Sequence, residues 1–183
     1  MSAHPELQCK IYPFGSQTDL KYVVVCSFYE GKLNNPGFVA KAPEKLVAEQ
    51  KQQLQKVLEK IGVENILMFY PDEGAMKRYS SMFDCPYAFG IKKRDWATGQ
   101  IQGLEVSGQK ELVEGSTILI VDDICSKGGT FYHSAKALKE LGAGKIYLYI
   151  SHCENTIFEG EILKDDLIER VFTTNSIFTN SDG

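Results

Sequence analysis

The residues best suited to chemistry lie between positions 118 and 130, where four apolar residues lead to two adjacent acids and then to a glycine pair. A buried strand would carry Asp122 and Asp123 at its carboxyl end, and Gly128 and Gly129 would open a helix. Glycines let backbone N–H groups approach a ligand closely, and the start of a helix carries partial positive charge, so this turn is suited to an anion. A phosphate in the turn, with hydroxyls against the acids, predicts a sugar-phosphate site.

Two other interpretations of this segment compete. In the simplest one, the acids end a strand and the glycines open a helix without any ligand. Paired acids after an apolar strand also occur in P-loop NTPases, where one acid holds magnesium. Those proteins need a G-x-x-x-x-G-K-[ST] loop, and the nearest stretch, 103–110, has Gln109 at the lysine position. The order of the whole segment favours the sugar-phosphate interpretation.

Charged residues at the ends of other predicted strands would handle a second, more anionic group. Asp72 follows the apolar run 66–70 and is the best placed ligand for Mg²⁺, which favours oxygen ligands and needs only one or two carboxylates. A diphosphate that is transferred or released is densely anionic, so the protein must supply cations. The candidate cations are Lys77, Arg78, Lys92, Lys93 and Arg94.

Some of these residues also have ordinary structural interpretations. The run 92–94 is typical of a solvated surface, but its position at a strand end, before a glycine-rich stretch, favours a functional role. His152 could equally be a packed histidine at a strand end, and His133 is expected on a helix surface. Trp96 either covers the ligand or packs against the protein.

The elements that must position these residues alternate along the chain. Apolar periodicity and stop signals predict helices over 42–61, 75–83, 128–141 and 156–164, and strands over 66–70, 86–91, 117–121, 145–150 and 168–172. Repeated strand–helix–strand units predict an α/β fold, a parallel twisted sheet flanked by helices. Ligands of such sheets bind at the carboxyl ends of the strands, where the candidate residues fall.

Two stretches depart from this alternation. Residues 8–14 and 21–28 predict an N-terminal β-hairpin, which would be the natural place for a hood over the acceptor. Residues 92–115 contain four glycines and predict a long flexible loop, with a hairpin as the alternative. No internal repeat or linker divides the chain, so we expect a single domain over 1–183, with a hood-like part over 1–40 and an α/β core over 42–177.

Composition limits the classes of partner. The formal net charge of −4, from 20 basic and 24 acidic residues, argues against a protein that coats nucleic acid. No apolar run reaches the roughly 18 residues that span a bilayer, and the N-terminus predicts no signal peptide. Five cysteines without a C-x-x-C pair and three scattered histidines predict reduced thiols and no zinc site. We therefore expect a soluble, cytoplasmic protein without a nucleic-acid or membrane partner.

The segment 118–130 resembles the motif with which type I phosphoribosyltransferases bind phosphoribosyl diphosphate (PRPP): four apolar residues, two acids and a phosphate loop. The resemblance implies the fold of that family. It also implies that Asp122 and Asp123 contact the 2′ and 3′ hydroxyls of the ribose. The loop that binds the 5′-phosphate would consist of Cys125, Ser126, Lys127, Gly128, Gly129 and Thr130.

Further segments resemble one branch of this family, the ribose-phosphate diphosphokinases. Residues 70–78 are similar to an S-P-D-x-G-G-x-K-R loop that meets the diphosphate and its metal, which implies a metal role for Asp72. It implies substrate contacts for Glu73, Gly74, Lys77 and Arg78. Residues 92–94 resemble a K-R-R loop whose first and third positions, Lys92 and Arg94, would stabilise the diphosphoryl group.

Two shorter segments extend the likeness. Residues 150–152 are similar to a T-H loop, which implies a substrate contact for His152, and residues 174–177 are similar to T-N-T-I. Ala75 and Ser151 depart from these patterns, and Cys153-Glu154 stand where glycine is expected. A full diphosphokinase has two related domains, and this chain resembles the second.

The resemblance implies an Mg²⁺-dependent phosphoribosyltransferase that moves phosphoribosyl from PRPP to a nitrogenous base and releases diphosphate. Lys92 and Arg94 would close over the departing group. Two alternatives stay open: a diphosphokinase that acts on ATP and ribose 5-phosphate, and a non-catalytic subunit that binds PRPP. A homo-oligomer is expected, and the sequence does not name the acceptor base.

Overall fold

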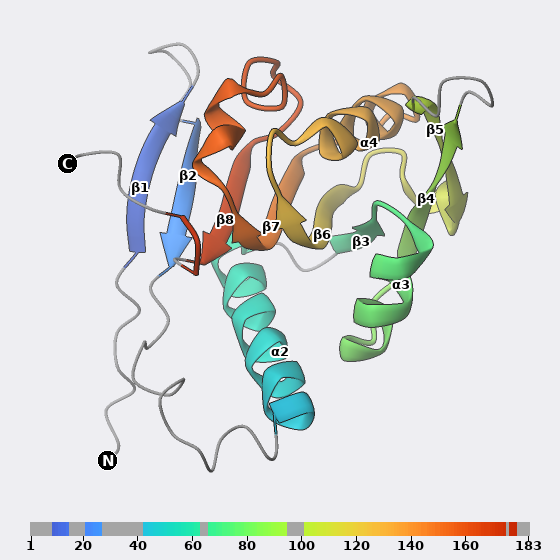
Figure 1. The fold of residues 1–183 in the computed structure, drawn as a ribbon. Coiled ribbons are helices and arrows are strands. Elements are labelled where there is room, and N and C mark those ends of the chain that lie inside the picture. The colour runs from blue at the N-terminus through green and yellow to red at the C-terminus, as the bar shows by residue number, and fades with distance from the viewer. Residues whose placement is uncertain are drawn as a thin grey trace.

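In a computed structural model of the chain, the structure describes residues 9–14, 21–26, 42–62, 66–94, 101–174 and 176–178. They form one eight-stranded sheet in the order β1-β2-β8-β7-β6-β3-β4-β5, with helices on both of its faces (Figure 1). The strands are β1 (Cys9–Phe14), β2 (Lys21–Cys26), β3 (Ile66–Tyr70), β4 (Tyr87–Arg94), β5 (Ile101–Gly108), β6 (Thr117–Cys125), β7 (Ile146–Cys153) and β8 (Arg170–Thr174). The helices are α2 (Ala42–Ile61), α3 (Glu73–Tyr79) and α4 (Gly129–Glu140), with 3-10 turns η2 (Ser80–Met82), η3 (Lys110–Leu112) and η4 (Asn155–Glu159).

The six central strands run parallel, and each edge of the sheet carries one antiparallel strand. Strands β2, β8, β7, β6, β3 and β4 pair in parallel, whereas β1 pairs antiparallel with β2, and β5 pairs antiparallel with β4. The parallel strands therefore end at the same edge of the sheet. This arrangement confirms the predicted fold class, a parallel sheet flanked by helices.

Alternate side chains of the parallel strands pack into two separate cores. On one face, Leu119 and Val121 of β6 pack with Leu54 of α2 and Tyr79 of α3. On the other face, residues such as Ile120 pack with the apolar side of α4. Strands covered on both faces need apolar residues at every position, which explains the uninterrupted apolar runs of β3 and β6.

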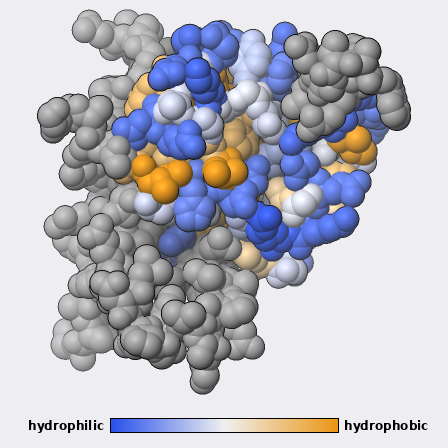
Figure 2. Space-filling view, in the orientation of Figure 1, coloured by the Kyte–Doolittle hydropathy of each residue, from blue (hydrophilic) through white to orange (hydrophobic). Residues whose placement is uncertain are grey.

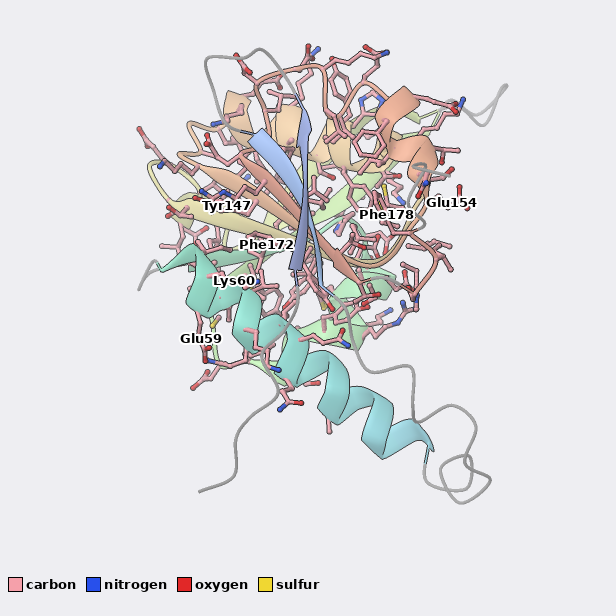
Figure 3. All side chains as sticks on the ribbon, turned by 90° about the vertical axis from the view of Figure 1, so that its left-hand side faces the viewer. Glu59, Lys60, Tyr147, Glu154, Phe172 and Phe178 are labelled. Atoms are coloured by element: carbon pink, nitrogen blue, oxygen red, sulfur yellow. The ribbon has the colours of Figure 1, made fainter. Side chains whose placement is uncertain are left out.

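The face that α2 covers also contains an aromatic pair. The rings of Tyr147 in β7 and Phe172 in β8 lie 6.4 Å apart, and Figure 3 shows both beside α2. The same view shows Tyr147 and Glu154 far apart. Tyr147 lies near the start of β7, whereas Glu154 directly follows its end. The aromatic pair thus belongs to the opposite end of the strand from the candidate site.

The described residues on the face that Figure 2 shows are mostly hydrophilic, with some hydrophobic residues among the polar ones. Single exposed apolar residues are normal for a folded protein. The large ones are Ile91, Leu112, Ile124, Leu141, Phe158 and Ile177. Within the described ranges, no helix is both long enough and apolar enough to cross a bilayer.

Several boundaries differ from the predicted ones. The predicted strands 117–121 and 145–150 continue to Cys125 and Cys153, because β6 and β7 extend together with these two cysteines as register partners. The paired acids therefore lie on β6 itself rather than after it. Helix α3 begins at Glu73 instead of position 75, because the Asp72 side chain caps it.

The predicted helix over 156–164 is wrong. Only the 3-10 turn η4 forms there, and it ends at Gly160, whose backbone is extended. Gly160 packs directly against the carbonyl group of Lys127, where any side chain would collide. The close approach of these two segments, rather than the local apolar spacing, decides the conformation.

The stretch predicted as a long loop is mostly ordered secondary structure. Strand β5 returns antiparallel beside β4, with a register irregularity between Lys93 and Arg94, and η3 follows it. The hairpin alternative is therefore correct for this stretch. Residues 95–100, which include Trp96, lie outside the described part, as do residues 1–8, 15–20 and 27–40 of the predicted hood. The role of the hood therefore stays a prediction.

Candidate active site

The candidate residues gather where the parallel strands end. Asp72 follows β3, Asp122 and Asp123 lie near the end of β6, and His152 lies near the end of β7. Lys92 reaches the same edge from β4. A parallel sheet brings these positions together although they are up to 80 residues apart in the chain (72 to 152).

Both oxygens of the Asp72 carboxylate have partners. Oδ1 accepts a hydrogen bond from the backbone N–H of Ala75 at 3.0 Å, which caps α3, and Oδ2 pairs with the Lys92 ammonium at 2.9 Å. Burial alone would raise the pKa of Asp72, but the hydrogen bond from Ala75 and the Lys92 charge outweigh it and lower the pKa. Asp72 is thus an anion that holds Lys92 at the site.

A second ion pair joins α3 to the end of β6. The Arg78 guanidinium binds the carboxylate of Asp123 and lies 5.9 Å from the ring centre of Tyr79. In the same helix, Lys77 pairs with Glu73 at 3.4 Å, and both of these side chains are exposed. An exposed pair of this kind contributes little to stability, so Lys77 and Glu73 can change partners at small cost.

Of the three acids at this edge, Asp122 is the one whose carboxylate forms no ion pair within the described part of the chain. It is half-buried, and its Oδ1 accepts the backbone N–H of Asp123 at 2.8 Å. Burial, followed by the neighbouring carboxyls of Asp123 and Asp72, raises the pKa of Asp122 to about 7. The three carboxyl groups of Asp72, Asp122 and Asp123 thus outnumber the two cations, Lys92 and Arg78, that pair with them.

That excess of carboxylate charge fits a bound cation. Among the residues that the structure describes, no three His, Cys, Asp or Glu side chains converge into a complete metal cage. Mg²⁺ does not require one, because it keeps several waters and takes one or two carboxylates together with phosphate oxygens of a substrate. One or two of the carboxylates at this edge would be enough for that mode of binding.

The turn after β6 places the start of α4 beside these acids. Gly128 precedes the helix with a φ of 78°. A Cβ atom added at Gly128 would lie only 2.6 Å from the Cγ2 atom of Ile162. Only glycine accepts both conditions. A Cβ added at Gly129 would meet nothing within 4 Å, and the N–H groups of a first helical turn have no acceptor inside the helix. These features suit the turn to an anion.

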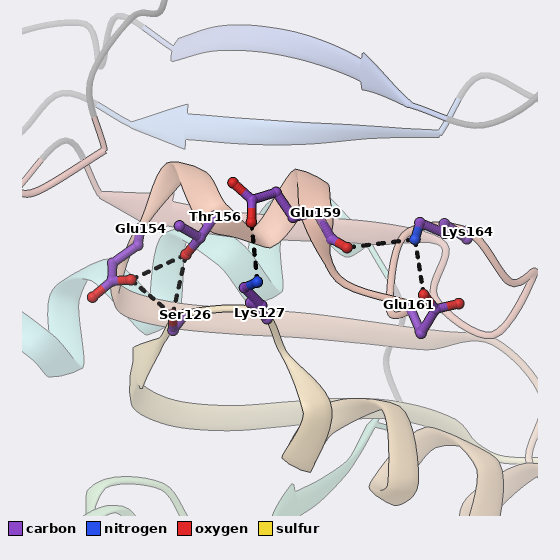
Figure 4. A network of polar contacts seen from close by, with 7 residues as sticks. All are labelled: Ser126, Lys127, Glu154, Thr156, Glu159, Glu161 and Lys164. Atoms are coloured by element: carbon purple, nitrogen blue, oxygen red, sulfur yellow. Dashed lines mark hydrogen bonds and ion pairs between the residues drawn. The ribbon is translucent and has the colours of Figure 1, made fainter.

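A carboxylate also lies at this turn. Oε2 of Glu154 accepts hydrogen bonds from Ser126 Oγ at 2.8 Å and from Thr156 Oγ1 at 3.0 Å, and the two hydroxyls are 3.1 Å apart (Figure 4). These hydrogen bonds lower the pKa of Glu154. The neighbouring Lys127 pairs with Glu159 at 3.1 Å.

His152 is held by the segment after β8. Its Nδ1 atom lies 2.7 Å from Ser176 Oγ, and that hydroxyl donates to the carbonyl of Ser151 at 3.1 Å. Thr174 Oγ1 donates to the same carbonyl at 2.6 Å. His152 itself is exposed, so its ring is oriented at the surface of the sheet edge.

Two predicted residues stand apart from this group. The Cys125 side chain is buried, and its thiol, hydrogen-bonded with that of Cys153 and desolvated, has a raised pKa. Only its backbone can face a ligand. The side chain of Arg94 lies outside the described residues.

Thr130 is at the first turn of α4, where its carbonyl accepts a hydrogen bond from the Ser134 hydroxyl at 2.9 Å.

Sequence reasoning did not place Glu154, Thr156 or Ser176 in the site. The first is visible as a departure, an acid where the resembling family has glycine, and the last lies within the segment similar to T-N-T-I. Thr156 has no signal in the sequence, because it reaches Ser126 only through the folded approach of two loops.

The phosphoribosyl transferase domain model matches residues 74–180, more than half of the chain. The chain therefore belongs to this family of transferases, and its sheet has the type I phosphoribosyltransferase fold. A model of the valyl tRNA synthetase tRNA-binding arm matches residues 26–63, about half of them in α2, which is too little to assign the chain to that family.

The curated relatives are ribose-phosphate pyrophosphokinases. That of Marinomonas sp. is 33% identical over 126 residues, which are 66% of this chain and 38% of the relative. That of Sulfurisphaera tokodaii is 31% identical over 135 residues, 72% of this chain and 45% of the relative. The match thus spans less than half the length of these proteins.

Solved structures show the same fold. The adenine phosphoribosyltransferase of Giardia lamblia superposes with a TM-score of 0.52 at 12% identity, over 76% of this chain and 82% of that one. The phosphoribosylpyrophosphate synthetase of Mycobacterium smegmatis superposes with a TM-score of 0.50 at 20% identity, over 68% of this chain and 46% of that one. Identities this low establish the fold alone.

Proposed function

We propose that the chain is an Mg²⁺-dependent phosphoribosyltransferase that uses PRPP and transfers its phosphoribosyl group to a nitrogenous base. The observation that carries this proposal is the meeting, at one sheet edge, of a carboxylate pair on β6, a helix start that only Gly128 can form, and the cations of α3 and β4. PRPP has a pentose, a terminal phosphate and a diphosphate. The edge offers one group of residues for each.

The ribose and its 5′-phosphate would bind at the end of β6. Asp122 and Asp123 accept hydrogen bonds from the 2′ and 3′ hydroxyls, and the turn 126–130 receives the phosphate at the start of α4. Two fixed ends prevent the sugar from turning, so C1′ faces the diphosphate side of the site.

The diphosphate would lie between α3 and β4. Arg78 and Lys92 already reach this edge through their carboxylate partners, and the pairs can exchange a carboxylate for a phosphate oxygen. Asp72 would hold Mg²⁺, which neutralises diphosphate charge when bound. As the base nitrogen bonds to C1′, the bond from C1′ to oxygen breaks and diphosphate departs with the electron pair. Lys92 and Arg94 would stabilise the charge that develops on it.

A second candidate is diphosphoryl transfer from ATP to ribose 5-phosphate. The identity of 31–33% to ribose-phosphate pyrophosphokinases supports it, and the position of Lys92 suits either reaction. Both candidate reactions use the same pentose phosphate site. They differ in the second substrate, which is a nitrogenous base in the first reaction and ATP in the second.

One assay distinguishes these functions. The purified chain is incubated with Mg²⁺ and either PRPP plus a panel of nitrogenous bases, or ATP plus ribose 5-phosphate, and diphosphate and AMP are measured. We expect base-dependent diphosphate release that EDTA abolishes. AMP formation would favour the second candidate. If neither incubation yields a product, the chain is a non-catalytic binding subunit.

A double variant links the assay to the site. Asp122→Asn with Asp123→Asn keeps the size of both side chains but removes the charge, so it should lower PRPP affinity by at least about tenfold in calorimetry. The matched control, Asp165→Asn, changes an exposed acid on the segment after η4 and should bind normally. Unchanged binding by the double variant would overturn the ribose assignment.

A further inference from the structure

The carboxylate of Glu154 accepts hydrogen bonds from two hydroxyls, one in the proposed phosphate turn and one beside it in η4. One oxygen, Oε2, takes the protons of both Ser126 and Thr156, at 2.8 and 3.0 Å. Figure 4 shows the three side chains converging from the turn after β6 and from the start of η4. A phosphoryl oxygen that bound these hydroxyls would need the same two protons.

Glu154 is also held firmly by its backbone. Its N–H donates to the carbonyl of Cys125 at 2.8 Å, which joins the end of β7 to the end of β6. The side chain can therefore turn away from the hydroxyls, but the backbone keeps its charge close to the turn. A phosphate monoester that entered would meet this negative charge.

We propose that Glu154 is a specificity-determining residue of the phosphate turn. Its carboxylate holds the Ser126 and Thr156 hydroxyls until a phosphoryl group takes them, and its charge weakens the binding of a dianion. The inference rests on the proposed function, since it assumes that the turn binds the phosphate of a pentose. In this proposal, Glu154 lowers the affinity of the turn for phosphate.

The size of the effect follows from Coulomb's law. A unit charge about 5 Å from a dianion in water-like surroundings weakens its binding by roughly tenfold. Glutamine keeps the size of the side chain and an oxygen that still accepts from both hydroxyls. Glu154→Gln therefore removes the repulsion while it preserves the hydrogen bonds that shape the turn.

Calorimetric titration with ribose 5-phosphate tests the proposal on the full chain. E154Q should bind about tenfold more tightly than the wild type, and the difference should narrow as salt screens the charge. The matched control is E161Q, which removes a carboxylate bonded to Lys164 at 2.8 Å farther along the same segment and should leave the affinity unchanged. Unphosphorylated ribose should bind all three proteins equally.

A second variant tests the hydroxyls themselves. Thr156→Val removes one donor but keeps the Glu154 charge, so it should weaken ribose 5-phosphate binding severalfold. It also keeps the proposal testable should E154Q fail to fold, which its melting curve reports.

Equal affinity of wild type and E154Q, or equal tightening by E154Q and E161Q, would overturn this inference while the proposed function stands. Unchanged binding by the Thr156 variant would remove the role of the hydroxyls. Failure of every protein to bind ribose 5-phosphate would overturn both the inference and the proposed function.

Discussion

The two adjacent acids of β6 have different surroundings, although they are neighbours in sequence. Asp123 pairs with the Arg78 guanidinium, whereas Asp122 is half-buried among other carboxyls. A ligand with a vicinal diol can use both, because an ionised carboxylate accepts hydrogen bonds and a protonated one can also donate. The raised pKa of Asp122 is a property that can be measured without any ligand.

We expect Asp122 to make the metal-free protein more stable at acidic than at alkaline pH. Its pKa is raised from 3.8 to about 7 on folding, so the folded state binds the proton that the unfolded state releases. The stability from this group is complete below about pH 4 and is lost as the pH rises through 7. The measurement is the melting temperature of the wild type minus that of D122N, both in EDTA. This difference should be roughly 2–6 °C smaller at pH 8 than at pH 5.

The exposed Asp84 supplies the control for this experiment. Asp84→Asn should leave the shape of the pH profile as it is in the wild type. Parallel profiles for the wild type and D122N would show that the pKa of Asp122 is not raised in the folded protein.

At the scale of elements, the start of α4 depends on one glycine. Gly128 has a positive φ and packs against Ile162, whereas the adjacent Gly129 faces open space. G128A should therefore lower the free energy of unfolding by about 2–4 kcal/mol, through an unfavourable backbone conformation and overpacking. G129A, the matched control, should change it by less than about 1 kcal/mol, since alanine is the better helix former. Urea denaturation measures both, and equal losses would contradict this account of the turn.

Elements with strong local signals could be predicted from the sequence. Helix α2 and strand β3 have the predicted bounds, because apolar periodicity and flanking glycine or proline define them locally. The segment 156–164 could not be predicted, because Gly160 lies against the Lys127 carbonyl, and that contact exists only in the folded chain. Local spacing predicted a helix where tertiary packing allows only a turn.

The candidate site could also be predicted only in part from the sequence. The acids of β6, the glycine turn and Asp72 follow from residue type and strand position, and the structure brings them to one edge. The approach of Glu154 and Thr156 to Ser126 could not be predicted, because those hydrogen bonds join loops 28 and 30 residues apart.

At the scale of the whole molecule, parallel strands explain how distant residues form one site. Six parallel strands end at one edge, and the antiparallel β1 and β5 extend the sheet at its two sides. Membership in the phosphoribosyl transferase family follows from the match over residues 74–180. The choice between base and ATP as the second substrate is the part that activity assays must decide.

In the proposed function, the turn between β6 and α4 binds the phosphate of a pentose. The most direct test is titration of ¹⁵N-labelled protein with ribose 5-phosphate, followed by NMR of the backbone amides. We expect the resonances of Gly128, Gly129 and Thr130 to shift and saturate, whereas ribose without its phosphate should leave them in place. Saturable binding with these three resonances unmoved, or no binding at all, would contradict the account.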